Sequence, residues 1–327
     1  MTIDLTDTST GAILETLMQA RLRMGGPALG MVLTLIVVTD EASQYDAIRA
    51  ASQAAREHPC RVLGVIIRTP SGRSRLDAEI RLGESGPGQM LLLRMYGPLA
   101  AHADSVVAPL ILLDTPVVTW WPGAGPAIPS ADPLGALAQR RVTDAAAADK
   151  PRQTLASLAS SYRPGDTDLS WTRATPWRSL LAATLDQSYG ESRAAVVSAE
   201  HNNPTADLLA TWLAVRLGIE VRRDVSAGPG ITSVTFDTPD GQVSISRPDG
   251  RTATLNRPGQ QDRRVALHRR DTAELLAEEL RRLDPDEVYG EVLARFASHP
   301  PGEGKPGEGK PSEGKPGEGK PSESDGS

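Results

Sequence analysis

Two nearly continuous apolar runs, separated by one helix-length segment, constrain the fold of this chain most. The runs are 31–38, MVLTLIVV, and 61–68, RVLGVIIR, and both are rich in β-branched residues. Continuous apolar strands are typical of sheets that are covered on both faces. The Ala-rich segment 41–57 between them has few helix breakers, and His58-Pro59 ends it. Strand, helix and strand in this order predict an α/β fold, with a mixed sheet flanked by helices.

The rest of the first half continues this alternation. A helix is expected over 9–23, and strands over 80–82 and 90–95 are expected to pair like a hairpin. A helix up to about residue 108 is expected to lead into a buried apolar strand over 110–113 and a β-rich segment over 117–119. A short helix over 134–140 and a strand over 141–144 complete this part.

The second half predicts a smaller domain with α+β character and an antiparallel meander. Thr175 followed by Pro176 is typical of an N-cap and first helical residue. A strand over 194–198 is followed by a helix that begins at Asn203-Pro204 and ends at Gly218. Short strands, some joined by Pro-Asp-Gly turns, and two helices follow: strands 219–223, 231–237, 243–246, 252–255 and 264–267, then helices 272–283 and 287–296.

The length of 327 residues favours two domains. Pro164-Gly165-Asp166 is a plausible break, so we expect an N-terminal α/β domain over 1–165 and a C-terminal α/β domain over 166–298. Residues 299–327 consist mainly of Pro-(Gly/Ser)-Glu-Gly-Lys repeats. Their lack of apolar side chains predicts a disordered tail.

Composition argues against several classes of protein. A net charge of −6 argues against binding driven by nucleic-acid phosphates. No apolar run approaches the roughly 20 residues of a membrane-spanning helix. The single cysteine, Cys60, allows no internal disulfide, and the five histidines lack metal-ligand spacing. Nucleophile-elbow and glycine-rich cofactor motifs are also missing, so we expect no catalytic residue, no metal and no cofactor.

Two further features bear on location and on charge. Residues 1–11 lack the basic and apolar regions of a signal peptide, so we expect a cytoplasmic protein. Arg-Arg pairs occur at 140–141, 263–264, 269–270 and 281–282. Such pairs usually lie on solvated faces of helices or strands; a nucleotide-phosphate site at one of them is the less common alternative.

Adjacent tryptophans, Trp120 and Trp121, follow the β-rich segment 117–119 and precede Pro122-Gly123. Neighbouring side chains of a strand point to opposite faces. One ring can therefore fill the core while the other forms part of a binding surface, where large aromatics are enriched. Alternatively, both rings are buried between sheet and helices.

The segment 168–178, DLSWTRATPWR, has a composition found at protein interfaces. Tryptophan buries a large area, and arginine makes bidentate contacts. The segment either binds a partner or forms a clasp in which Trp171 and Trp177 pack on the first domain. Both interpretations stay open, and one segment can do both.

A possible ligand site lies at His201, Asn202 and Asn203, between a predicted strand and the helix after it. Ligands collect at this end of strands in α/β sheets, and helix N-termini favour anions. His201 could act there as a general base. The plainer interpretation is that Asn203 caps the helix and that Glu200 and His201 are loop surface.

Several blocks of the sequence resemble the OpcA family, the glucose-6-phosphate dehydrogenase assembly proteins, in its high-GC bacterial branch. They are HPCRVLGVI (58–66), LILLDTPVVTWWPG (110–123), RRVTDAA (140–146) and DLSWTRATPWRSLLA (168–182), and the start of the chain fits as well. The resemblance covers about residues 1–298 in order. The repeat tail lies outside it.

The resemblance implies a non-catalytic partner that binds glucose-6-phosphate dehydrogenase, promotes its active oligomer and raises its activity. The resemblance therefore also implies increased NADPH production at the entry of the oxidative pentose phosphate pathway. Photosynthetic relatives are linked to redox control through cysteines, but Cys60 stands alone here and only an intermolecular role is left open. No nucleic acid or membrane partner is implied.

The dehydrogenase-binding surface is expected to be formed or braced by a small set of residues, and a rival function uses a different set. The first set is Asp114, Trp120, Trp121, Asp168, Trp171, Thr172, Arg173, Trp177 and Arg178. In the rival interpretation, the chain is an enzyme or sensor that binds a sugar phosphate or nucleotide at Glu200–Asn203.

Overall fold

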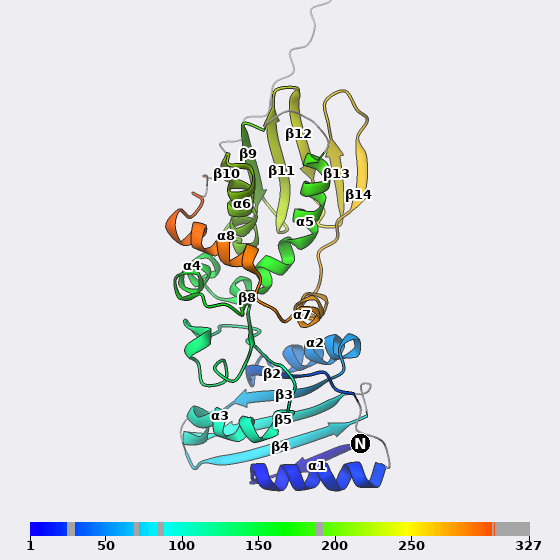
Figure 1. Ribbon diagram of the computed structural model, residues 1–327, viewed down its shortest axis with the longest axis vertical. Coiled ribbons are helices and arrows are strands. Elements are labelled where there is room, and N and C mark those ends of the chain that lie inside the picture. Colours follow the sequence, from blue (N-terminus) through cyan, green and yellow to red (C-terminus); the bar gives the residue numbers. More distant parts are fainter. Residues whose placement is uncertain (25–29, 69–71, 84–87, 187–191, 303, 305–327) are drawn as a thin grey trace, which may run out of the picture.

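The computed structural model describes residues 1–24, 30–68, 72–83, 88–186, 192–302 and 304. Figure 1 shows two layered halves, one above the other, each built on one sheet. This arrangement confirms the predicted α/β class with two mixed sheets. The predicted tail lies almost wholly outside the described residues. None of the described helices is long and apolar enough to cross a membrane.

The first sheet is mixed, with parallel pairing from β5 through to β8 and antiparallel pairing at β1 and β4. Its order is β1 (Thr2–Leu5), β4 (Arg75–Leu82), β5 (Gln89–Tyr96), β3 (Cys60–Ile67), β2 (Leu33–Asp40), β6 (Val117–Trp120), β7 (Arg140–Thr143) and β8 (Asp166–Asp168). The apolar runs β2 and β3 are neighbours at its centre. β8 carries the sheet on to Asp168, so the domain limit expected at residue 165 falls between β7 and β8.

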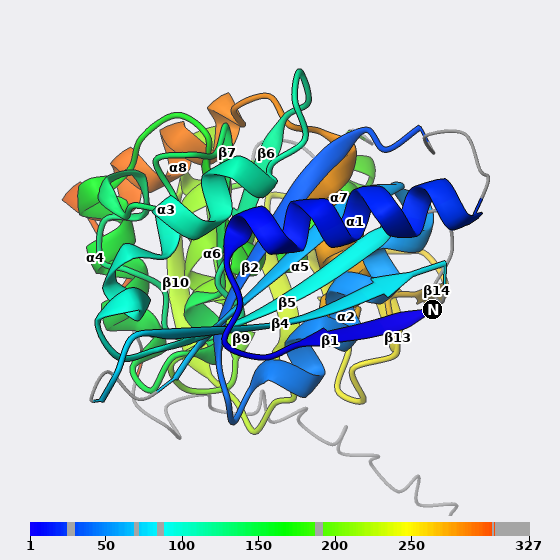
Figure 2. The same ribbon diagram turned by 90° about the horizontal axis from the view of Figure 1, so that it is seen from below.

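Helices cover both faces of this sheet, which explains why its central strands are apolar throughout. The helices α1 (Thr10–Met24) and α3 (Ala103–Val107) pack on one face, and Figure 2 shows α1 lying across the strands. The helices α2 (Gln44–Glu57) and α7 (Thr272–Arg281) share the core of the other face. Because α7 comes from the second half of the chain, it joins the two halves (Figure 1).

The second sheet contains the predicted meander. Its order is β10 (Glu220–Val225), β9 (Ala194–Ala199), β11 (Ile231–Thr238), β12 (Gly241–Ser246), β13 (Thr252–Asn256) and β14 (Arg263–Ala266). β9 and β10 are parallel, and the other described pairs are antiparallel. The helices α5 (Leu169–Leu185) and α6 (Pro204–Leu217) share its core, while α4 (Pro151–Ser161) and α8 (Glu287–Ser298) pack together beside the junction. Short 3-10 helices complete the described elements: η1 (Gly97–His102), η2 (Ala108–Leu110), η3 (Pro129–Ala131) and η4 (Ala145–Ala147).

Helix α6 matches its predicted limits because both ends are encoded locally. The side chain of Asn203 accepts a hydrogen bond from the Ala206 amide at 2.9 Å, as an N-cap does. Gly218 ends the helix with φ of 66°, a left-handed conformation that glycine adopts without strain. The cap interpretation of Asn203 is therefore confirmed.

The strand expected over 110–113 is wrong. The chain there leaves the 3-10 helix η2 and turns at Asp114, whose φ is 58°, and Leu113 is exposed. Pro109 and Pro116 flank this run, and proline has no N–H to donate to a strand ladder. The strand β6 begins after them, at Val117.

The short helix expected over 134–140 is also wrong, since the segment is a series of turns. The carboxylate of Asp132 accepts the amides of Leu134 and Gly135, at 2.9 and 3.1 Å. Gly135 lies so close to the backbone that a Cβ there would meet the Pro129 carbonyl oxygen at 1.9 Å. Local side-chain bonding replaces the helical ladder.

The helix expected to start at Thr175 begins earlier, at Leu169, and contains Pro176 in its interior. Asp168 caps it by accepting the Ser170 amide at 2.8 Å. Pro176 lacks the N–H that would bond to the Thr172 carbonyl. The guanidinium of Arg270 donates to that carbonyl instead, which is how this helix tolerates its proline.

Cys60 lies at the start of β3 and is completely buried. Burial raises the pKa of its thiol to about 12. Because the thiolate is the reactive form, we expect iodoacetamide at pH 8 to alkylate the native chain at least about 100-fold more slowly than the urea-unfolded chain. Mass spectrometry of timed samples measures both rates. Equal rates would mean that Cys60 is accessible and open to redox chemistry.

Candidate functional site

The segment 168–178 lies where the two halves meet. Asp168 is buried at the start of α5 and caps that helix. Its second carboxylate oxygen accepts hydrogen bonds from the Thr143 hydroxyl at 2.7 Å and the Ala145 amide at 2.8 Å, both in the first half. Asp168 therefore joins the halves and does not face solvent.

Trp171 is the centre of this junction and is only 1% exposed. Its indole N–H donates to Asp286 at 2.8 Å, and its ring lies 5.5 Å from the ring of Tyr289 in α8. The guanidinium of Arg178 lies 3.6 Å from the indole centroid. The same apolar cluster includes Leu155 of α4, from the first half. The clasp interpretation is confirmed for Trp171.

A buried ion pair adds a second link between the halves. Glu279 of α7 accepts from Arg140 Nε of β7 at 3.1 Å and from the Thr172 hydroxyl at 2.6 Å. Arg140 and Arg141 are both buried, so the expectation that this arginine pair lies on a solvated face is wrong. Each has a buried carboxylate partner, Glu279 and Asp166 respectively. Because each guanidinium is paired with a carboxylate, both arginines can be buried while charged.

Arg173 forms a third link, because its guanidinium binds both carboxylate oxygens of Asp144 at 2.6 and 2.7 Å. Burial works against its charge, but the hydrogen bonds to Asp144 prevail and raise the pKa of Arg173 above its usual value. Asp144 follows β7 of the first sheet. Both terminal nitrogens of the Arg173 guanidinium are therefore bonded to Asp144 of the same chain.

The tryptophans do not form an exposed surface in the free chain. Trp120, Trp121 and Trp177 are all buried, as Trp171 is. Trp120 belongs to the core between the first sheet and α2, and Trp177 to the core of the second half. Of the two interpretations of Trp120 and Trp121, burial of both rings is confirmed and the outward ring is wrong. Clasping by Trp177 is also wrong, since its cluster contains residues of the second half. Among the expected dehydrogenase-binding residues, Asp114 alone is exposed.

An exposed apolar stripe on α1 has no counterpart among the surfaces expected from the sequence. Leu14, Met18 and Leu22 recur every four residues and are 38%, 60% and 77% exposed. Ile13 and Leu17, one position earlier, are buried against the sheet. The signal is present in the sequence, since the helix has more apolar residues than one buried face needs. We call these three exposed residues the α1 stripe.

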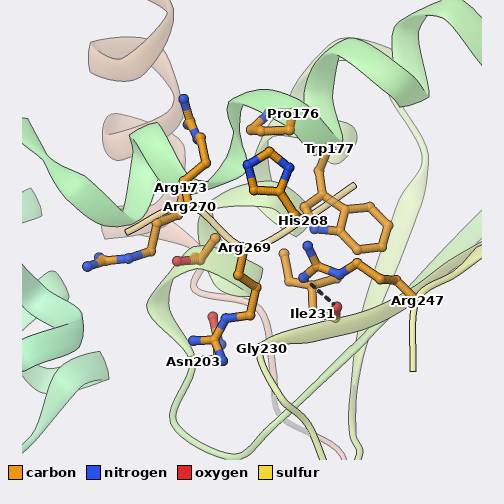
Figure 3. Close-up of a pocket in the computed structure, with 11 residues that line it drawn as sticks. Arg173, Pro176, Trp177, Asn203, Gly230, Ile231, Arg247, His268, Arg269 and Arg270 are labelled. Atoms are coloured by element: carbon orange, nitrogen blue, oxygen red, sulfur yellow. Dashed lines mark hydrogen bonds between the residues drawn. The ribbon is translucent and has the colours of Figure 1, made fainter. Parts of the chain in front are cut away.

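A cationic cavity lies between α5, the N-terminus of α6 and the loops that precede β11 and follow β12 and β14 (Figure 3). Its volume is about 60 Å³. We call it the α5–α6 cavity, and its lining residues are Arg173, Pro176, Trp177, Asn203, Thr205, Gly230, Ile231, Arg247, His268, Arg269 and Arg270. Neither His201 nor Asn202 is among them; both are exposed in the turn before α6.

Arg247 is the buried cation of this cavity and is 5% exposed. Its guanidinium donates to the carbonyls of Leu267 and Ile231 at 2.9 and 3.0 Å, and it lies 5.0 Å from the ring of Trp177. Burial, and then the charge of Arg269, lower the pKa of Arg247 to about 10. Arg247 is still charged at neutral pH.

The other cations of the α5–α6 cavity differ in how they are paired. Arg173 and Arg270 bind Asp144 and Glu278. Within the described ranges, no carboxylate forms an ion pair with Arg247 or Arg269. Figure 3 shows the Arg269 guanidinium beside Asn203 and Gly230. The cavity therefore has two arginines whose charge is not neutralised by direct pairing.

Comparison with protein families identifies the family of this chain. Residues 51–160 match the family model of the N-terminal domain of a glucose-6-phosphate dehydrogenase subunit, and residues 164–293 match the model of its C-terminal domain. The chain belongs to the OpcA family. The resemblance seen in the sequence is confirmed, and the two matches meet next to β8. Among curated proteins, none matches the chain.

Solved structures with a similar arrangement are distant in sequence. A mutant of KijD10, a 3-ketoreductase from Actinomadura kijaniata, is 13% identical with a TM-score of 0.44, over 82% of this chain and 95% of that one. An oxidoreductase from Sinorhizobium meliloti is 10% identical with a TM-score of 0.39, over 82% of this chain and 87% of that one. Likeness of this degree says nothing about activity.

Proposed function

We propose that this chain is a non-catalytic subunit that binds glucose-6-phosphate dehydrogenase, promotes its active oligomer and raises its activity. The observation that carries the proposal is the match to both domains of the dehydrogenase-associated family, in order, over most of the chain. NADPH production in the oxidative pentose phosphate pathway would increase as a result. We place this activity in the cytoplasm.

The buried carboxylates fit a scaffold role. Asp144, Asp207 and Glu279 each lie against arginine, and Asp168 caps α5 while bonding to the first half. Burial raises the pKa of Asp144 and of Asp207, but arginine partners occupy both carboxylates, whereas a catalytic carboxylate faces a cleft with room for substrate. Here these groups hold elements of the chain to one another, which supports a binding protein over an enzyme.

We propose the α1 stripe as the surface that contacts the dehydrogenase. Partner surfaces are built around apolar side chains that stay exposed in the free protein. The stripe is the one group of large exposed apolar residues in the described chain that follows a helical repeat. Glu15 and Arg21 line the groove beside the stripe, together with Arg61, which is only 6% exposed, so the groove presents charges of both signs around the apolar side chains.

Activation follows from linkage. A regulatory partner raises activity only if it binds the active conformation or oligomer of the dehydrogenase more tightly than the inactive one. A coupling of about 1–3 kcal/mol would give roughly 5- to 150-fold activation. No group of this chain needs to reach the reacting atoms.

The test is the dehydrogenase rate against glucose 6-phosphate, with and without this chain, together with the size-exclusion mass of the mixture. We expect a larger particle and a lower KM or higher kcat. No complex and no change in rate would refute the proposal. Turnover by the chain alone, lost in His201→Ala, would favour the rival enzyme.

The double variant Met18→Asp/Leu22→Asp should weaken dehydrogenase binding by about tenfold or more, because a buried leucine-sized side chain contributes about 1.5–3 kcal/mol. Its thermal unfolding midpoint should stay near that of the wild type, since both side chains face solvent. Biolayer interferometry measures the affinity. Tyr45→Asp is the matched control: Tyr45 is 74% exposed on α2, across the sheet from α1. Equal loss in the control, or no loss in the double variant, would show that the stripe is not the contact.

A further inference from the structure

We propose that the α5–α6 cavity binds a phosphate group, either free or carried by a small molecule. This inference goes beyond the proposed function and does not depend on the dehydrogenase. It rests on three independent features of the described residues: two arginines without a paired carboxylate, an unbonded amide in the first turn of a helix and a matching volume.

The first feature is the position of the charges. Arg247 lies on the buried side of the cavity and its Nε has no hydrogen-bond partner, while Arg269 lies on the exposed side. Both line the same cavity. Neither acidic side chain nearby in the described chain forms an ion pair with them: Glu200 accepts from Asn203 at 3.0 Å, and Asp249, whose charge partly offsets the lowering of the Arg247 pKa, accepts the amides of Arg251 and Thr252. An anion between the two arginines would relieve their mutual repulsion.

The second feature is the N-terminus of α6, a helix of 14 residues. Pro204 has no N–H, and the amides of Ala206 and Asp207 bond to Asn203. Thr205 lines the cavity, and within the described chain its amide donates to no acceptor in the helix or its cap. Amides of a first helical turn, together with the helix dipole, favour anions.

The third feature is size. A cavity of about 60 Å³ has room for a few water molecules or one tetrahedral anion, but not for a whole sugar or nucleotide. A larger ligand would place its phosphate inside and the remainder beyond Arg269, at the solvent side. The ligand class is therefore defined by the phosphate group.

Binding at this cavity has a consequence for the junction. Its walls include Arg173 and Arg270, which bond to Asp144 of the first half and to the Thr172 carbonyl in α5. A bound phosphate would attract both guanidinium groups toward the cavity. Occupancy is then coupled to the contact between the halves.

The test uses the full chain alone, with inorganic phosphate as the probe, in buffers of equal ionic strength made up with chloride. Calorimetric titration should give saturable binding, and the thermal unfolding midpoint should rise with phosphate at low millimolar concentration. Arg269→Ala should weaken phosphate binding about tenfold or more, because it removes a charge-assisted hydrogen bond. Arg264→Ala, on the exposed strand β14, is the matched control and should bind as the wild type does.

Two outcomes of this first titration would overturn the proposal. One is the absence of saturable binding to the wild-type chain. The other is an equal rise of the unfolding midpoint in the wild type and both variants, which is the general stabilisation that phosphate gives as a kosmotropic ion. Arg269→Lys, which keeps the charge, should restore part of the binding if Arg269→Ala lowers it.

A second titration with a hexose 6-phosphate and with the unphosphorylated hexose distinguishes the source of the phosphate. Tighter binding of the ester than of inorganic phosphate assigns the cavity to a phosphorylated metabolite, and equal or weaker binding assigns it to free phosphate. Binding of the unphosphorylated hexose with the same affinity as its 6-phosphate would overturn the proposal, since recognition would not involve the phosphate.

Discussion

Glu279→Ala is expected to lower the free energy of unfolding by about 3–5 kcal/mol, because it leaves Arg140 buried without a counter-charge. Both side chains are nearly inaccessible, at 5% and 6% exposed, and they link β7 to α7 across the junction. The Thr172 hydroxyl loses its acceptor in the same step. Urea unfolding followed by tryptophan fluorescence measures the change.

Glu57→Ala is the matched control for this variant. Glu57 pairs with Arg281 at 3.2 Å, so it also joins α7 to the first half, but both side chains are more than half exposed. Exposed ion pairs contribute up to about 1 kcal/mol, so this change should be small. If Glu279→Ala does not fold, Glu279→Gln keeps an acceptor for Thr172 and should give a smaller loss. Equal effects of Glu57→Ala and Glu279→Ala would mean that burial of the pair contributes nothing.

Elements whose limits are encoded nearby can be predicted from the sequence. The helix α6 has its cap Asn203, its first residue Pro204 and its stop Gly218 all in place. The strands β2 and β3 stand out because continuous β-branched runs have few alternatives. In each case the deciding interactions lie within a few residues along the chain, so local patterns suffice.

Elements decided by distant partners are predicted poorly. Pro176 looks like a helix start, and it is tolerated inside α5 because Arg270 bonds to the carbonyl that it leaves free. Arg140 looks solvated, and it is buried because Glu279 is there to pair with it. Neither partner lies near in sequence, so no local pattern could indicate either outcome.

The candidate sites show the same division. Composition identifies the segment 168–178 as special but does not separate a binding surface from a clasp, since both use tryptophan and arginine. The sequence context of Asn203, between a strand and a helix, correctly predicts that it caps α6. Arg247 and Arg269 follow β12 and β14, far along the chain from Asn203, and only the folded meander brings them to the α5–α6 cavity.

Trp171→Ala should lower the free energy of unfolding by about 3–5 kcal/mol, the usual cost of removing a large buried aromatic ring. The cavity would open between Leu155, Arg178 and Tyr289, that is, between parts of both halves. Trp171→Phe keeps a ring in place but removes the hydrogen bond to Asp286. It should therefore lower the free energy of unfolding by only about 1 kcal/mol. Thermal and urea unfolding of both variants measure the difference.

The same two variants separate a clasp from a partner-binding surface. Because Trp171 is 1% exposed, folded Trp171→Ala should bind glucose-6-phosphate dehydrogenase within about twofold of the wild type when assayed well below its unfolding midpoint. A variant with wild-type stability but weakened binding would reverse this conclusion, since the indole would then have to leave the junction to reach the partner. The indole would have to leave Asp286 and Tyr289 on the side of α8, and also the apolar cluster that it shares with Leu155 of the first half.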